Sequence, residues 1–139
     1  MNLFVLVSTG QKVANLPPVL ELAQTGDRTL WIVSEEARKR NWTSGPRAVL
    51  EKAGLVTMTE IVVPHVNDPS LLTTQLKPTV DSLIDQFTSV YLVTNGGTKH
   101  TPIGLLNAFQ TLSPMLLYGD ERPAVYSVYP SRFTASPRV

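Results

Sequence analysis

The sequence predicts an α/β fold in which a mostly parallel sheet is flanked by helices and ends in an antiparallel β-hairpin. Two observations support this fold class. Short apolar segments rich in β-branched residues alternate four times with segments whose apolar residues recur at helical spacing. The last two apolar segments are instead separated by the short turn Gly119–Pro123, which suits a hairpin. Such alternation is typical of parallel strands joined by right-handed helical crossovers.

The predicted strands share a short apolar run bounded by polar residues. They cover residues 2–8, 29–33, 57–63, 89–93, 115–118 and 124–129. The first is apolar almost throughout, as in a strand that is covered on both faces. The third alternates before it becomes apolar, and it ends at Pro64. We therefore expect a sheet with helices on both sides.

The predicted helices share an apolar face at steps of three and four residues. They cover residues 16–23, 44–53, 69–87 and 101–112. Their starts carry candidate caps or early prolines, namely Asn15, Ser44-Gly45-Pro46, Asp68-Pro69 and Thr101-Pro102. Pro78 should kink or split the third helix. Residues 37–42 fit either a helical turn or a surface loop.

Composition limits the possible functions. The chain has 139 residues and a net charge of +1, which suits one domain and gives no reason to expect duplex nucleic acid as a partner. There is no cysteine, so disulfides and thiolate chemistry are excluded. No apolar run approaches the length of a membrane span, so we expect no membrane partner and a cytoplasmic location. We expect a ligand-binding domain over residues 1–130, with residues 131–139 as a tail or the start of a linker.

The usual strand order of such a sheet, 3-2-1-4-5, predicts the binding site. Ligands bind past the carboxyl ends of the strands where the winding reverses, which here lies between the first and fourth strands. The loops that leave these strands, Ser8–Asn15 and Thr94–Lys99, are both polar and contain glycine. Gly96 and Gly97 precede a helix start, where backbone N–H groups and the helix dipole attract an anion. Lys99 adds a charge, and further hydrogen-bonding side chains come from Thr94, Asn95 and Thr98. The alternative is an ordinary tight turn.

Several common chemistries lack their motifs. No G-x-G-x-x-G sequence follows the first strand, and no Gly-Lys-Ser/Thr phosphate-binding loop occurs. No Asp, Glu or His cluster has metal-ligand spacing, so we expect no metal site and no cofactor. His65 and His100 are isolated and fit surface or loop-packing roles better than ligation. A redox enzyme and a nucleoside triphosphatase are therefore disfavoured.

The two loops carry a resemblance to a known family. Asn95-Gly-Gly-Thr-Lys99 after the fourth strand, with Val7-Ser-Thr-Gly-Gln11 and Asn15-Leu-Pro-Pro18 after the first, resembles the CARF (CRISPR-associated Rossmann fold) domain. The likeness covers roughly residues 2–129 and is greatest to sensor domains that precede a nuclease or deaminase effector in type III CRISPR antiviral systems. It implies a Rossmann-like fold and a homodimer that binds cyclic oligoadenylate across its two-fold axis.

The resemblance also implies roles for individual residues. Thr98 and Lys99 would hold phosphate or ribose. Thr9, Gly10 and Gln11 would line the floor of the site near the two-fold axis. Ser34 and Glu35, after the second strand, are candidates to reach an adenine or a ribose edge. Cyclic tetra-adenylate is the favoured ring, with hexa-adenylate as the second choice. The complete candidate ligand site is Ser8, Thr9, Gly10, Gln11, Ser34, Glu35, Thr94, Asn95, Gly96, Gly97, Thr98 and Lys99.

Three functions stay open at this point. The first is an allosteric sensor that signals to an effector domain; relatives carry one after the sensor, so the chain's end favours an excised domain over a stand-alone one. The second is a metal-free ring nuclease using Lys99, Ser8 and Thr9, although neither switch-point loop holds a histidine. The third is a small domain that binds a mononucleotide. We favour binding over cleavage, and expect the dimer interface to use leftover aromatic residues: Phe109, Tyr118, Tyr126 and Tyr129.

Overall fold

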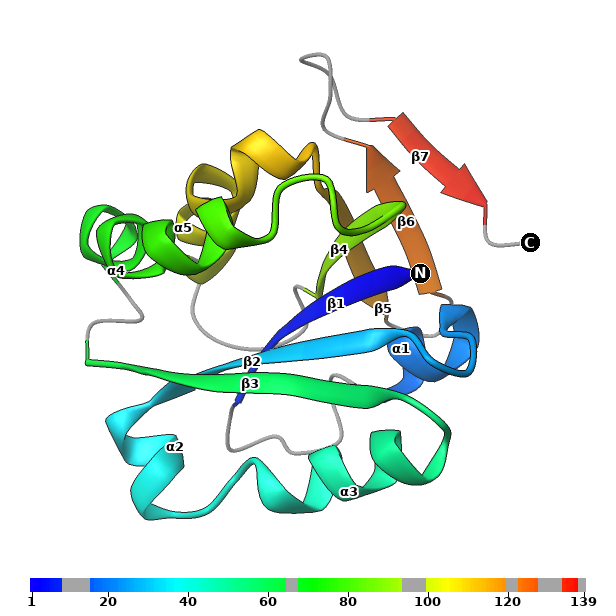
Figure 1. The fold of residues 1–139 in the computed structure, drawn as a ribbon, viewed down its shortest axis with the longest axis horizontal. Coiled ribbons are helices and arrows are strands. Elements are labelled where there is room, and N and C mark those ends of the chain that lie inside the picture. Colours follow the sequence, from blue (N-terminus) through cyan, green and yellow to red (C-terminus); the bar gives the residue numbers. More distant parts are fainter. Residues whose placement is uncertain (9–15, 65–67, 94–99, 120–122, 128–133, 138–139) are drawn as a thin grey trace.

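One sheet organises the molecule (Figure 1). The structure is a computed structural model that describes residues 1–8, 16–64, 68–93, 100–119, 123–127 and 134–137. Its strands are β1 (Asn2–Val7), β2 (Arg28–Ser34), β3 (Val56–Val63), β4 (Ser89–Val93), β5 (Met115–Gly119), β6 (Pro123–Ser127) and β7 (Thr134–Pro137). They lie in the order β3-β2-β1-β4-β5-β6-β7. The first five in this order are parallel, which confirms the predicted α/β class and the order 3-2-1-4-5.

The sheet continues beyond β5 with antiparallel strands. β5 pairs with β6, where Leu117 faces Val125, and β6 pairs with β7, where Tyr126 faces Ala135. The sequence pattern did not predict β7. Its four residues, Thr-Ala-Ser-Pro, contain no large apolar side chain, so periodicity gives no signal, and main-chain pairing alone defines the strand.

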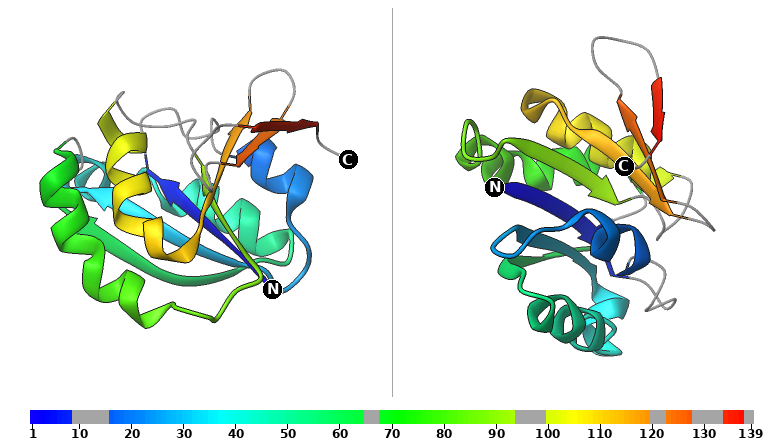
Figure 2. Two further views of the ribbon diagram at one scale, coloured as in Figure 1. Left: turned by 90° about the horizontal axis from the view of Figure 1, so that it is seen from above. Right: turned by 90° about the vertical axis from the view of Figure 1, so that its right-hand side faces the viewer.

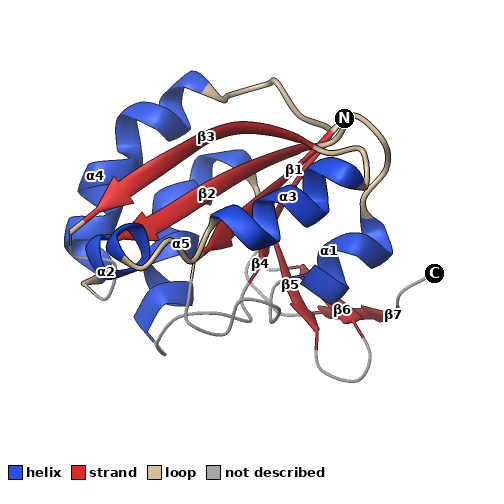
Figure 3. Ribbon diagram, turned by 90° about the horizontal axis from the view of Figure 1, so that it is seen from below, coloured by secondary structure: helices blue, strands red, loops and turns tan. Residues whose placement is uncertain are grey.

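Helices cover both faces of the sheet (Figures 2 and 3). They are α1 (Leu16–Leu22), α2 (Glu35–Lys39), α3 (Ser44–Lys52), α4 (Pro69–Ser82) and α5 (His100–Phe109), which the 3₁₀ turn Gln110–Leu112 extends. Helices α4 and α5 lie on one face, and α1, α2 and α3 lie on the other. The undecided segment after β2 is therefore helical at its start. Ser34 caps α2 by accepting a hydrogen bond from the Ala37 amide at 3.1 Å.

Alternating residues of β1 divide the core in two. Leu3, Val5 and Val7 pack against α4 and α5, whereas Phe4 and Leu6 pack among the residues of α1, α2 and α3. All five side chains are at most 2% exposed. This pattern is the one expected of a central parallel strand, because successive side chains point to opposite faces of a sheet that is covered on both sides.

Two predicted helix boundaries are wrong. The helix expected over residues 69–87 ends at Ser82, and it is not split at Pro78. Leu83 and Phe87 still pack on the core, so the apolar period outlasts the helix, whereas Ile84 is 48% exposed. The predicted cap Thr101 lies inside α5, which begins at His100, and its side chain is buried.

The turn before β2 is fixed by a buried carboxylate. Asp27 is 4% exposed, and its two oxygens accept hydrogen bonds from the Asn2 amide at 3.0 Å and from the Gln24 amide at 2.9 Å. The Asp27 carbonyl also accepts from the Val56 amide at 2.9 Å. This single residue therefore ties together the amino ends of β1, β2 and β3.

We expect Asp27→Asn to lower the free energy of unfolding by roughly 1 kcal/mol, because an amide offers one acceptor oxygen where two amide donors converge. The control is Asp68→Asn. The Asp68 carboxylate accepts one hydrogen bond, from the Leu71 amide at 3.1 Å, and this bond caps the start of α4. Asparagine caps helices equally well. Urea denaturation of both variants measures the difference. Equal free energies of unfolding for Asp27→Asn and Asp68→Asn would show that the second carboxylate oxygen of Asp27 does not stabilise the fold.

Candidate functional site: the carboxyl edge between β1 and β4

The winding of the sheet reverses between β1 and β4. β1 pairs with β2 on one side and with β4 on the other, both in parallel, so the chain leaves β1 and β4 at the same edge. The pair is fastened across the reversal point by Phe4 and Tyr91, whose rings stack with centroids 5.1 Å apart and planes 15° apart. The predicted adjacency of these two strands is confirmed.

Much of the predicted site lies outside the described residues. This applies to Thr9, Gly10 and Gln11 after β1, and to the loop after β4 with its residues Thr94, Asn95, Gly96, Gly97, Thr98 and Lys99. His65 lies outside them as well. The structure does describe what flanks these loops: the end of β1 with Ser8, the end of β4 at Val93, and helix α5 from His100 onward.

Ser8 is held on the face covered by α1, α2 and α3. Its amide donates to the Ile32 carbonyl at 2.9 Å, which extends the β1–β2 pairing by one residue. Its side chain is buried, and its Oγ lies 2.6 Å from Oγ1 of Thr43. The sequence pattern did not indicate Thr43 as a residue of the site. Its position just before Ser44-Gly45-Pro46 suggests a helix cap, but nothing in the pattern indicates a partner 35 residues away.

The two candidates after β2 have local partners. The Ser34 hydroxyl caps α2, as described above. Glu35, whose side chain is 47% exposed, forms an ion pair with Arg38 at 2.9 Å. A second pair joins Glu36 and Arg40 at 3.2 Å. Ser34 and Glu35 therefore have local roles at the start of α2.

A network of ion pairs links α3 to β3, away from the reversal point. Arg47 of α3 forms ion pairs with Glu51 at 3.2 Å and with Glu60 of β3. The hydrogen bond from Thr57, followed by that from Arg47, lowers the pKa of the Glu51 carboxyl. The bonds to Glu60 and Glu51 raise the pKa of Arg47. This network lies on the surface and joins the helix to the edge strand.

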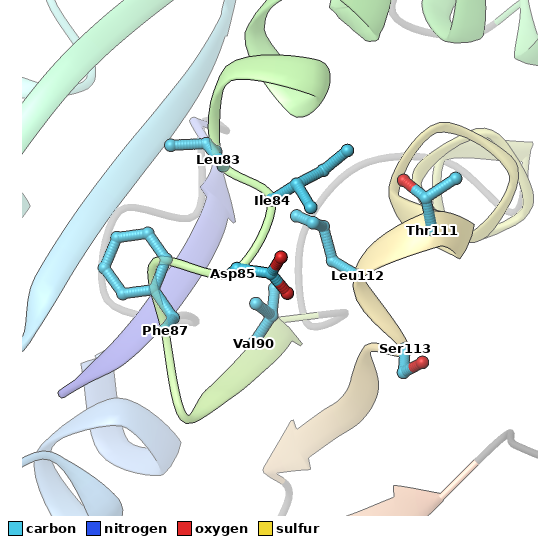
Figure 4. A pocket seen from close by; sticks show the side chains of 8 residues that line it. All are labelled: Leu83, Ile84, Asp85, Phe87, Val90, Thr111, Leu112 and Ser113. Carbon is cyan, nitrogen blue, oxygen red and sulfur yellow. The ribbon is translucent and has the colours of Figure 1, made fainter.

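Two hollows lie at the opposite, amino edge of the sheet. One, of about 180 Å³, is lined by the connections into β4 and β5, and Figure 4 shows Asp85 and Ser113 among its apolar side chains. The other, of about 580 Å³, includes Met1, Arg28 and Met58. Within the described ranges there is no group of three potential metal ligands, and no helix long and apolar enough to cross a bilayer.

Two solved structures align with nearly the whole chain. Can2 from Sulfobacillus thermosulfidooxidans, in complex with cyclic tetra-adenylate, matches 100% of this chain with a TM-score of 0.68 and 15% identity. Protein VC1899 from Vibrio cholerae matches 99% with a TM-score of 0.73 and 14% identity. The chain spans 37% and 36% of those two chains. No family model matches the sequence, and no curated protein does so either.

These similarities define a CARF-like fold. The predicted resemblance is thus confirmed at the level of the fold, because nearly the whole chain aligns with both structures. Identities of 14% and 15% do not extend the agreement to individual site residues.

Proposed function

We propose that this chain is a sensor domain that binds cyclic oligoadenylate, with cyclic tetra-adenylate as the favoured ring and hexa-adenylate as the second candidate. The observation that carries the proposal is the fold similarity, over the full length of the chain, to a protein solved with cyclic tetra-adenylate bound. The polar loops that leave β1 and β4 at one edge support it, because this is where a sheet of this topology binds ligands.

The ligand suits this edge chemically. A cyclic oligoadenylate carries one phosphate per nucleotide and has no free end. The amino end of helix α5, which begins at His100, lies toward the carboxyl edge with the positive end of its dipole, and Lys99 comes immediately before it in the sequence. A phosphate group would be attracted by both. Asn95, Thr98 and Thr94 offer further hydrogen bonds from the same loop.

We propose a homodimer as the binding unit. A ring with two-fold symmetry is enclosed most simply by two copies of one site, related by the same axis. One predicted interface residue is wrong: Phe109 is fully buried in the core under α5, so it is unavailable to a partner. Tyr118, Tyr126 and Tyr129 stay candidates. In the proposed type III CRISPR antiviral system, ligand binding would be passed to an effector.

Binding, rather than cleavage, is the proposed role. A metal-free ring nuclease must align a ribose 2′-hydroxyl with the adjacent phosphate and stabilise the leaving oxygen. Of the candidate groups Lys99, Thr9 and Ser8, the hydroxyl of Ser8 is buried and paired with Thr43. A serine held in this way helps to shape a site but is not placed in the open to meet a reacting phosphate.

Titration calorimetry with cyclic tetra-adenylate, cyclic hexa-adenylate and linear tetra-adenylate tests the proposal. We expect the cyclic tetramer to bind with one ring per two chains, and the linear control to bind more weakly. Chromatography of the same mixtures should recover intact ring after minutes. Failure of both rings to bind would refute the sensor role, whereas rapid conversion to linear products would establish the ring nuclease. Light scattering that finds a monomer at roughly tens of micromolar protein would contradict the dimer.

A further inference from the structure

The buried hydroxyl pair Ser8–Thr43 joins the end of β1, at the proposed ligand edge, to the connection between α2 and α3. Ser8 directly follows β1 and is the last described residue before the loop, at the edge where the ligand is proposed to bind. Thr43 lies in the connection between α2 and α3, behind that edge. Both side chains are 5% exposed, and their oxygens are 2.6 Å apart. Removing one of the two hydroxyls costs free energy, because the other is then left buried without a hydrogen-bond partner and without water.

The local structure around Thr43 makes this bond unusual. Thr43 occupies the N-cap position of α3, where a threonine oxygen ordinarily accepts from the amide two or three residues later. Here the side chain makes no capping bond, and the Thr43 backbone is in the αR region. The Thr43 carbonyl still accepts from the Arg47 amide at 2.9 Å, so the residue is fixed to the helix through its backbone. The hydroxyl is thus directed away from its own helix and toward β1.

The connection that carries Thr43 is itself held firmly. The Trp42 amide donates to the Ala37 carbonyl at 3.0 Å, and the Arg40 guanidinium lies 5.9 Å from the centre of the Trp42 ring. Ala37 and Pro46, on either side of the connection, are buried. Thr43 therefore offers a rigid support for Ser8, anchored by α2 and α3 and not by the ligand-binding loops.

A pair of hydroxyls also has a defined hydrogen-bonding capacity. The two oxygens carry two protons, and the bond between them uses one. Either oxygen can be the donor. When Thr43 donates, the Ser8 proton is left for a second acceptor, and when Ser8 donates, the Thr43 proton is. In either arrangement the bond joins the end of β1 to the connection before α3.

We infer that Thr43 is a positioning residue for the ligand site: its hydroxyl fixes Ser8, and through Ser8 it fixes the point at which the chain leaves β1. This inference rests on the proposed binding function. The bond holds the Ser8 side chain and the end of β1 in place before the ligand arrives, which spares the binding step the cost of ordering them.

The test compares three variants with the wild type. Thr43→Val keeps the shape and removes the hydroxyl, whereas Thr43→Ser restores the hydroxyl without the methyl group. Thr29→Val is the matched control, because Thr29 is also a buried threonine, 1% exposed, near the amino end of β2. Each protein is titrated with cyclic tetra-adenylate and melted in the absence of ligand. Thr43→Val is expected to weaken binding roughly tenfold, the effect of about one lost hydrogen bond.

The outcomes separate the inference from the function on which it rests. The positioning role predicts weaker binding by Thr43→Val, recovery in Thr43→Ser and unchanged affinity in Thr29→Val, even where both valine variants lose similar melting temperature. Unchanged affinity in Thr43→Val, with binding by the wild type, overturns the positioning role alone. A parallel loss in Thr29→Val overturns it too, because general destabilisation would then explain the effect. Failure of the wild type to bind refutes the proposed function and this inference with it.

Discussion

Lys99→Ala is expected to weaken the binding of cyclic tetra-adenylate by roughly a hundredfold or more, because a symmetric dimer would lose two charge-assisted hydrogen bonds to phosphate of ~1.5–3 kcal/mol each. Lys99 immediately precedes α5, where its charge adds to the positive end of the helix dipole. In a symmetric dimer the substitution removes one such contact from each half of the ring. The expected loss is therefore the largest of any single substitution at the proposed site.

Lys77→Ala provides the control for this change. Lys77 is an exposed lysine of α4 that pairs with Asp81 at 3.1 Å, so its removal changes the net charge by the same amount. Calorimetric titrations at two salt concentrations should find normal affinity in Lys77→Ala and reduced affinity in Lys99→Ala. If Lys99→Ala instead loses melting temperature and keeps its affinity, Lys99 has a structural role and the proposed phosphate contact is wrong.

Gly104→Ala is expected to lower the free energy of unfolding by about 1–2 kcal/mol, although alanine is the better helix former. A Cβ atom at position 104 would lie 2.8 Å from Cδ2 of Leu72 and 3.2 Å from the Cα of Pro69. Leu72 is completely buried, and Pro69 begins helix α4, so neither contact can be relieved freely. The two helices would have to separate at the place where α5 starts.

Gly45→Ala is the matched comparison. Gly45 is also in a helix, near the start of α3, but a Cβ atom there would have no neighbour within 4 Å. Thermal and urea unfolding should find Gly45→Ala as stable as the wild type or slightly more stable. Should Gly104→Ala match it, the packing of α4 against α5 would be looser than the structure describes, and the start of α5 would be free to shift.

The sequence predicted the sheet because its signals are local. Strands β1, β2 and β4 are short apolar runs with polar ends, and each one is followed by a helical pattern or a glycine. The order of the parallel strands was predicted from the usual arrangement of doubly wound sheets. The end of α4 was missed because Leu83 and Phe87 continue the apolar pattern after the helix has stopped, and Asp85 turns the chain with a φ of 64° that asparagine and aspartate tolerate.

The candidate site was predictable only in outline. The reversal of winding between β1 and β4 follows from strand order, so the edge where ligands bind could be located. The contact of Ser8 with Thr43 could not, because it joins residues 35 positions apart through side chains that carry no periodic signal. The burial of Phe109 was missed for a related reason: a helical pattern gives an apolar face but not which member of that face lies deepest.

The network between α3 and β3 also bears on whether a strand of another chain can pair with the edge of this sheet. β3 is an outermost strand of the sheet, and Met58 and Val62 are each 40% exposed on it. Glu60 lies on the same strand, and its carboxylate is paired with Arg47 of α3. A charged side chain on an edge strand deters a second strand from adding to it, and the register shift in β3 opposite Thr29 and Leu30 disturbs the edge further. The charge on Glu60 and the register shift are thus two features of this edge that disfavour the addition of a further strand.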